Sequence, residues 1–119
     1  MIECSLRDDS MRTRLINQQI TFTAQRLTQR RVSEETATSA PGYASSAVKL
    51  SNALITQEGD EILVAAMGTQ GIGWALTGFK TAEIDATRDW LKQKSLTIAG
   101  GTKEVQLNII AKRVLGLPD

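Results

Sequence analysis

The side chains that could carry chemistry are few, and the missing types exclude several classes of site. The chain of 119 residues has no histidine, so imidazole acid–base catalysis, a Ser-His-Asp triad and most zinc sites are excluded. Its single cysteine, Cys4, has no neighbouring base to activate it as a nucleophile and cannot form an internal disulfide. The carboxylates are scattered, without the spacing of a metal site.

One turn offers a physical binding function. Gly100, Gly101 and Thr102 directly precede a helical pattern. Backbone N–H groups, the positive end of a helix dipole and a hydroxyl would meet there, and glycine leaves room for close approach. Such a turn suits a phosphate or another anion. The same residues also suit a plain turn with a threonine cap, so the residue types alone leave both interpretations open.

Four helical patterns must position these residues, near 9–31, 43–67, 82–95 and 102–115. Because convincing strand alternation is missing, the sequence predicts an all-α fold in a single domain over 1–119. The polar segment between the first two helices contains Pro41-Gly42 and is expected to be a mobile connection. The glycine-rich residues 67–79 do not match the dinucleotide fingerprint and are expected to form a helix–helix loop.

Apolar spacing predicts which helix faces pack. The first helix carries a broad apolar stripe: Met11, Leu15, Ile16, Ile20, Phe22, Ala24 and Leu27. The second helix is expected to lie between two neighbours, because it has two apolar faces: Ala47, Leu50 and Leu54 on one, Val48, Ile55 and Ile62 on the other. In the third helix Thr81 is the expected N-cap, and the expected core contacts are Ile84 and Leu91, with Trp90 beside them.

The last helix has the most complete set of end signals. Thr102 is its expected N-cap and Glu104 lies in its first turn. Gly116 fits the left-handed position after the helix, followed by Leu117 and Pro118. The expected apolar stripe is Val105, Ile109, Ile110 and Val114.

Charge and hydropathy narrow the class of protein. The formal net charge is +1, whereas a general nucleic-acid binder would be strongly basic. No apolar run approaches the roughly 20 residues of a membrane span, and charged residues occupy the place of a signal peptide's apolar stretch. The sequence therefore predicts a cytoplasmic protein without nucleic-acid or membrane partners.

The final residues resemble a known family. TIAGGTKEVQLNIIAKRVLGLPD, from Thr97 to Asp119, is closely similar to the C-terminal end of acyl-CoA dehydrogenases. The family pattern there is a Gly-Gly-Thr turn, then Glu-Ile-Gln, Asn-Ile-Ile-Ala and Arg-Val-Leu-Gly-Leu-Pro. Residues 47–50 are similar to the family's Ile-Ala-Lys-Leu segment, and residues 67–73 fall at its glycine-rich loop. The resemblance extends from Asp8 onward.

The resemblance implies a flavoenzyme that removes hydrogens from the α and β carbons of an acyl-CoA thioester. FAD accepts the hydride, a carboxylate takes the α proton, and an electron-transfer flavoprotein reoxidises the flavin. The chain resembles the antiparallel C-terminal helical bundle without its first helix and without the two domains that enclose the substrate. The combination is similar to bacterial enzymes acting on bulky CoA thioesters, as in fatty-acid or steroid side-chain metabolism, some of which are hetero-oligomers.

Carried across residue by residue, the resemblance implies cofactor contacts but no catalytic residue. Gly101, Thr102 and Glu104 would line the FAD, with the turn amides near its phosphate and ribityl portion. Gly71 and Gly68 would belong to the loop that meets the FAD of a neighbouring subunit.

Two departures from the family pattern bear on the chemistry. Gly100 stands where many relatives carry the catalytic glutamate, so no base is expected in this chain. Ala65 replaces the glutamine common at the start of the glycine-rich loop, which argues against the adenine contact in trans.

Two functional hypotheses follow. The first is the FAD-binding and oligomerisation domain of an acyl-CoA dehydrogenase, inactive and without retained FAD when isolated. The alternative is a stand-alone, non-catalytic helical interaction module derived from that family. In both cases the lack of the first bundle helix predicts an uncovered apolar groove, closed by self-association or by a partner acyl-CoA dehydrogenase subunit.

Overall fold

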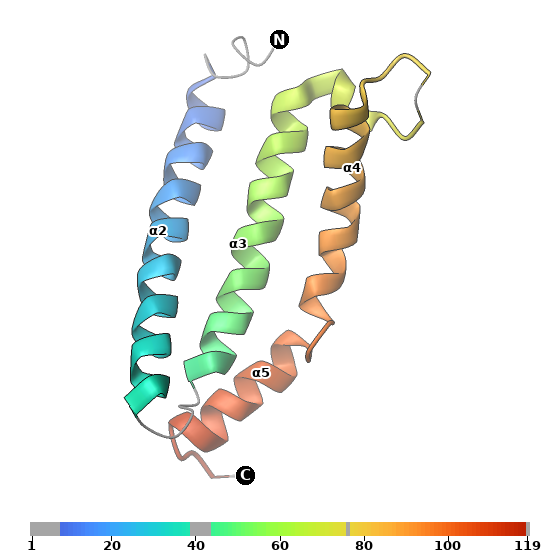
Figure 1. Ribbon diagram of the computed structural model, residues 1–119. Coiled ribbons are helices and arrows are strands. Elements are labelled where there is room, and N and C mark those ends of the chain that lie inside the picture. The colour runs from blue at the N-terminus through green and yellow to red at the C-terminus, as the bar shows by residue number, and fades with distance from the viewer. Residues whose placement is uncertain (1–7, 39–43, 76, 119) are drawn as a thin grey trace.

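The fold is built from antiparallel helices (Figure 1). The computed structural model describes residues 8–75 except 39–43, and residues 77–118. Within these ranges the long helices are α2 (Asp9–Thr38), α3 (Ala44–Met67) and α4 (Thr81–Gln93), and every regular element is helical. A short α5 (Lys103–Ile109) continues as the π-helical segment η3 (Ile110–Val114) and crosses below α3. The predicted all-α bundle is confirmed.

The central helix α3 contacts α2 on one side and α4 on the other, as its two apolar faces predict. Ile55 and Ile62, seven residues apart on one face, are both buried, whereas Leu54 of the other predicted face is 51% exposed. The Gln18 and Gln25 side chains of α2 donate to the Ile55 and Val48 carbonyls, so this face lies toward α2. Helix packing therefore uses one of the two predicted faces more fully than the other.

Helix α2 extends seven residues beyond the predicted end at Arg31, so the expectation of a loop there is wrong. Ion pairs at i,i+4 spacing, Arg30–Glu34 and Arg31–Glu35, each 2.8 Å, support the polar extension. The hydroxyls of Ser33 and Thr36 donate to backbone carbonyls one turn back, so both side chains find their hydrogen-bond partners within the helix. The rest of the expected mobile connection, residues 39–43, lies outside the described residues, as does Cys4.

The predicted apolar stripe of α2 does not lie in a core. Ile16, Ile20 and Leu27 are 53%, 62% and 63% exposed. At 100° per residue they fall on the side of the helix opposite Gln18 and Gln25, whose side chains bond to α3. Leu15 and Phe22 are also exposed, although they fall about 60° and 40° from Gln18 around the helix. The side of α2 that carries Ile16, Ile20 and Leu27 therefore points away from the rest of the described chain.

The predicted beginning and core of α4 need two corrections. Lys80, not Thr81, is the N-cap, and the carboxylate of Glu83 accepts from the Lys80 N–H at 2.8 Å. Ile84 is 2% exposed, as predicted, but Leu91 is 45% exposed and is not a core residue. The 3-10 turn η2 (Lys94–Thr97) continues the helix to its predicted end.

The last helix has the ends that the sequence predicts, but its predicted apolar stripe is not buried. The Val105 N–H donates to the Thr102 hydroxyl at 3.4 Å, so Thr102 is the N-cap. Gly116 has the expected left-handed φ of 65°. Val105 and Val114, both predicted in the apolar stripe, are 49% and 48% exposed. The helix lies at the edge of the bundle, where little covers its outer side.

The chain is elongated for its size. Its radius of gyration is 17.8 Å, against about 13.5 Å for a compact domain of this length. Its accessible surface is 8403 Å², against about 6,300 Å² for a folded monomer of this mass. None of the described helices is long and apolar enough to cross a lipid bilayer.

Candidate functional site

The Gly-Gly-Thr turn connects η2 to α5, at the junction of α3, α4 and α5 (Figure 1). Gly100 and Gly101 have left-handed φ angles of 73° and 107°, which other residues adopt only with strain. A Cβ on Gly101 would lie 2.7 Å from Nε2 of Gln106. The turn therefore requires glycine for both its backbone angles and its packing.

Two donors from different helices hold the carbonyl groups of this turn. Gln106 in α5, whose side chain is buried, donates from Nε2 to the Gly100 carbonyl at 2.9 Å. Lys49 in α3 donates from Nζ to the Gly101 carbonyl. The two consecutive carbonyls are thus satisfied from inside the bundle, which fixes the path of the backbone between them.

Glu104 lies at the exposed N-terminal end of α5. Its own backbone N–H and the Thr102 hydroxyl both donate to the carboxylate, and these bonds lower the pKa of Glu104. The carboxylate is therefore ionised at neutral pH and is a poor proton acceptor. Glu104 acts here as an acceptor for donors at the turn.

Two lysines lie close to the turn. Lys49 and Lys103 both line a small recess between α3 and the start of α5, together with Leu50, Ala53, Leu54 and Thr97. Within the chain the Gly101 N–H donates to the Ile98 carbonyl at 3.1 Å and the Lys49 ammonium donates to the Gly101 carbonyl, so both groups help to hold the turn. Gly100, at the position of the family's base, offers no side chain for proton transfer.

The other predicted cofactor residues lie elsewhere. Gly68 and Gly71 belong to the 3-10 turn η1 (Gly68–Ile72), which follows α3 at the opposite end of α4 from the Gly-Gly-Thr turn. The 13 residues of α4 separate the two regions, a helix length of about 20 Å. The structure therefore does not bring the η1 glycines and the Gly-Gly-Thr turn together within one chain. The resemblance implies that the η1 glycines meet the FAD of a neighbouring subunit, so this separation is compatible with it.

Gly71 has a packing role that the sequence does not reveal. It is buried, and a Cβ there would lie 2.5 Å from the Val64 carbonyl oxygen. Its own carbonyl accepts from the Thr87 hydroxyl of α4 at 3.1 Å. Gly68 has a left-handed φ of 57° with open space around it. Gly71 thus joins η1 to α4, while Gly68 lets the chain turn.

Sequence reasoning missed Lys49 and Gln106 as parts of the site. Lys49 lies 52 residues from the carbonyl that it holds, and periodicity cannot pair residues over that distance. Gln106 is buried although its type is usually exposed. The only available signal was that both occur within the segments that resemble the family.

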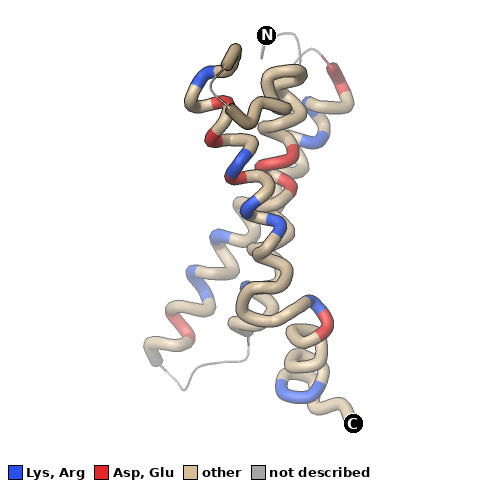
Figure 2. The backbone as a smooth tube through the Cα atoms, turned by 90° about the vertical axis from the view of Figure 1, so that its right-hand side faces the viewer, with Lys and Arg blue, Asp and Glu red and all other residues tan. Residues whose placement is uncertain are grey.

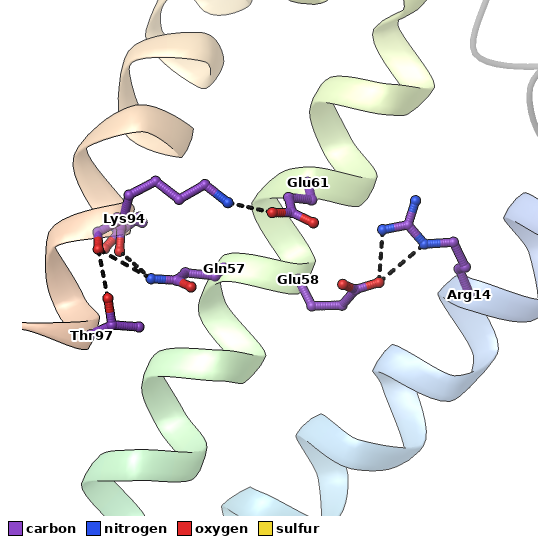
Figure 3. A network of polar contacts seen from close by, with 7 residues as sticks. Arg14, Gln57, Glu58, Glu61, Lys94 and Thr97 are labelled. Atoms are coloured by element: carbon purple, nitrogen blue, oxygen red, sulfur yellow. Dashed lines mark hydrogen bonds and ion pairs between the residues drawn. The ribbon is translucent and has the colours of Figure 1, made fainter. Parts of the chain in front are cut away.

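A second polar cluster joins the three long helices but offers no comparable site (Figure 3). Arg14 of α2 pairs with Glu58 of α3 at 2.8 Å, and Lys94 pairs with Glu61. Lys94 lowers the pKa of Glu61, chiefly by its hydrogen bond. These carboxylates are engaged with cations and link helices.

Asp60, next to Glu61, has the opposite environment. Burial raises its pKa, and Asp89 adds to the increase. Its Oδ2 and the indole Nε1 of Trp90 are buried without a hydrogen-bond partner among the described residues. Figure 2 shows that positions of Lys and Arg and positions of Asp and Glu both occur along the helices.

Comparison with known families identifies the chain. Its residues 5–115 match the family model described as "Acyl-CoA dehydrogenase, C-terminal domain". The match covers most of the sequence, so the chain belongs to this family. No curated protein matches the sequence, and no solved structure matches it.

Proposed function

We propose that this chain is the part of an acyl-CoA dehydrogenase that contributes the Gly100–Thr102 turn to an FAD site and packs against other subunits. The observation that carries the first role is the turn itself, in which Lys49 and Gln106 hold two left-handed glycines in place. The family match over residues 5–115 supports it.

The residues of the turn fit a diphosphate-containing cofactor. Gly101, which has no side chain, would allow close approach of the phosphate and ribityl portion, Thr102 would offer its backbone N–H, and Glu104 would accept hydrogen bonds from the ribityl hydroxyls. When bound, FAD supplies hydride acceptance from the acyl-CoA. This chain binds and orients but provides no base at Gly100, so the proton acceptor, the acyl-CoA site and the electron-transfer flavoprotein contact belong to other parts of the complete enzyme.

An NMR titration tests the flavin role directly. Millimolar FAD added to the ¹⁵N-labelled chain is expected to shift the amide signals of residues 100–104, and riboflavin, which lacks phosphate, to shift them less. Gly101→Ala should abolish the response, because its Cβ would displace Gln106. Gly78→Ala is the matched control, since Gly78 is also left-handed but has open space around it. Absent or scattered shifts with FAD would contradict the proposal and favour the stand-alone interaction module.

The absence of a base predicts that the chain has no acyl-CoA dehydrogenase activity by itself. Dye reduction with acyl-CoA and added FAD is expected to stay at the level of the protein-free control. Turnover by the purified chain would show that a proton acceptor had been overlooked.

A second observation favours the packing role. The outward apolar face of α2, formed by Ile16, Ile20 and Leu27, is continuous over three turns. In the isolated chain a second copy is the available cover, and in the enzyme a partner subunit fills that role.

A further inference from the structure

Lys49 is the residue of α3 that reaches the α4–α5 junction. Its Nζ donates to the Gly101 carbonyl, and its half-buried stem lies against the recess that Leu50 and Thr97 also line. The ion pairs described above use Lys94 and three arginines. Lys49 thus directs its ammonium group to a backbone carbonyl.

The geometry gives that bond a specific task. A left-handed glycine pair has many accessible conformations, so the observed φ angles of Gly100 and Gly101 persist only if neighbours fix them. Gln106 fixes the first carbonyl from within α5, and Lys49 fixes the second from a separate helix. Gln57 and Glu61 of α3 hold the end of α4 and the start of η2, and Lys49 is the residue of α3 that bonds to the turn itself.

A purely space-filling lysine would behave differently. Its aliphatic stem could be replaced by methionine, which has similar length and fills the same recess. The Gly101 carbonyl would then lose its donor, while the packing of α3 would remain. The two roles are separable by experiment.

We propose that Lys49 is a positioning residue for the flavin-contacting turn. It acts through the Gly101 carbonyl and holds the turn in its bound geometry before any cofactor arrives. This inference rests on the proposed flavin role for its functional meaning, but the clamp itself is a property of the chain alone.

Residue-resolved amide hydrogen exchange on the full chain tests the clamp without FAD. In Lys49→Met, the bonded amides of the turn are expected to exchange about tenfold faster or more, as for loss of one charge-assisted bond; they are those of Gly101, Val105 and Gln106, which donate to the Ile98 carbonyl, the Thr102 hydroxyl and the Thr102 carbonyl. Amides in the middle of α2 and α4 should keep their protection. Lys49→Arg, which can still donate, should restore most of it, and Lys92→Met, an exposed lysine elsewhere, should change nothing.

Two exchange results would overturn the clamp. One is turn exchange in Lys49→Met equal to that in Lys92→Met. The other is an equal loss of protection over all helices, which would make Lys49 a general stability residue and not a positioning one.

An FAD titration of the same variants separates this inference from the proposed function. Weaker FAD-induced shifts in Lys49→Met than in the unaltered chain support both. Equal shifts in the two proteins would overturn the positioning role and leave the flavin role intact. Faster turn exchange in Lys49→Met, together with no FAD response in the unaltered chain, would retain the clamp and overturn the flavin role.

Discussion

Helices α4 and α2 contribute different kinds of side chain to the bundle. In α4, Ile84 is 2% exposed, and Thr87 is buried with its hydroxyl on the Gly71 carbonyl of η1, the turn that follows α3. On the α2 side, the only buried side chain among the described residues of α2 is Gln25, which bonds to α3 through the Val48 carbonyl at 3.1 Å. Helix α4 thus buries an apolar side chain, whereas α2 offers mainly polar atoms to α3.

This difference explains where the apolar residues of α2 go. Because Arg14, Gln18 and Gln25 occupy the side toward α3, Ile16 and Ile20 face outward. Burying apolar surface is the main favourable term in folding and association, so a helix of this kind gains from a cover on its outer side. The α3–α4 part of the bundle buries its own apolar residues. Helix α2 instead has a polar side toward α3 and an apolar side that is free to contact another surface.

The largest expected effect is removal of the best-buried side chain. Ile84→Ala should lower the free energy of unfolding by about 2–5 kcal/mol, because it leaves a cavity in the α3–α4 contact. Ile72→Ala is the matched control, since Ile72 is 77% exposed. Urea unfolding followed by circular dichroism measures both. Similar costs for the two variants would mean that the α3–α4 contact is not the core.

Next in size is Gly71→Ala, which tests the close packing of η1 against the end of α3. The added Cβ would lie 2.5 Å from a backbone oxygen that cannot move freely, and such overpacking costs about 1–3 kcal/mol. In Gly59→Ala the new Cβ would meet only the flexible end of Gln18, at 3.1 Å, so stability should stay within about 1 kcal/mol. Thermal melts of both variants give the comparison, and a harmless Gly71→Ala would contradict the close packing.

The α2–α3 contact should respond to loss of its buried amide. Gln25→Ala removes the bond to Val48 and the acceptor of the Ser51 hydroxyl, 2.7 Å away, at a cost of about 1–2 kcal/mol. Gln19→Ala, on an exposed part of the same helix, should be near neutral. A cost for Gln25→Ala as large as that of Ile84→Ala would break the contrast between the two contacts.

The smallest effects come from two adjacent carboxylates with opposite pKa shifts. The raised pKa of Asp60 means that its ionised form destabilises the fold above that pKa, and the penalty disappears as the pH falls through it. Asp60→Asn should therefore stabilise the chain at neutral pH and lose that advantage in acid.

Glu61 should show the reverse dependence. Its pKa is lowered, so the stability from its pairing with Lys94 is present at neutral pH and is lost as the pH falls through the folded value. Glu61→Gln should cost at most about 1 kcal/mol at neutral pH, since both side chains are partly exposed. Unfolding curves at several pH values distinguish the two, and parallel pH profiles would refute the assigned causes.

The sequence predicted the elements better than their partners. The ends of the last helix followed from Thr102 and Gly116, whose caps are local and are found as expected. The outward face of α2 could not be predicted, because apolar periodicity shows that a face is apolar but not what covers it. The extension of α2 depended on its Arg–Glu pairs, which outweighed a polar composition typical of loops.

The candidate site was predictable only in part. The Gly-Gly-Thr turn was visible in the residue types, but its dependence on Lys49 joins segments 52 residues apart and becomes apparent only when α3 and α5 meet. The buried Gln106 was hidden for a different reason, because its amide is satisfied by a turn whose shape local sequence does not specify.

The outward face of α2 is the feature on which the proposed packing role depends, and sedimentation equilibrium over a wide concentration range tests it most directly. The average mass is expected to rise with concentration above the 13.0 kDa of one chain. Ile20→Glu, which charges the face, should shift the chain toward the monomer, whereas Gln19→Glu, with the same charge change about 100° around the helix, should not. A mass of 13.0 kDa at every concentration, in the unaltered chain and in both variants, would contradict the packing role.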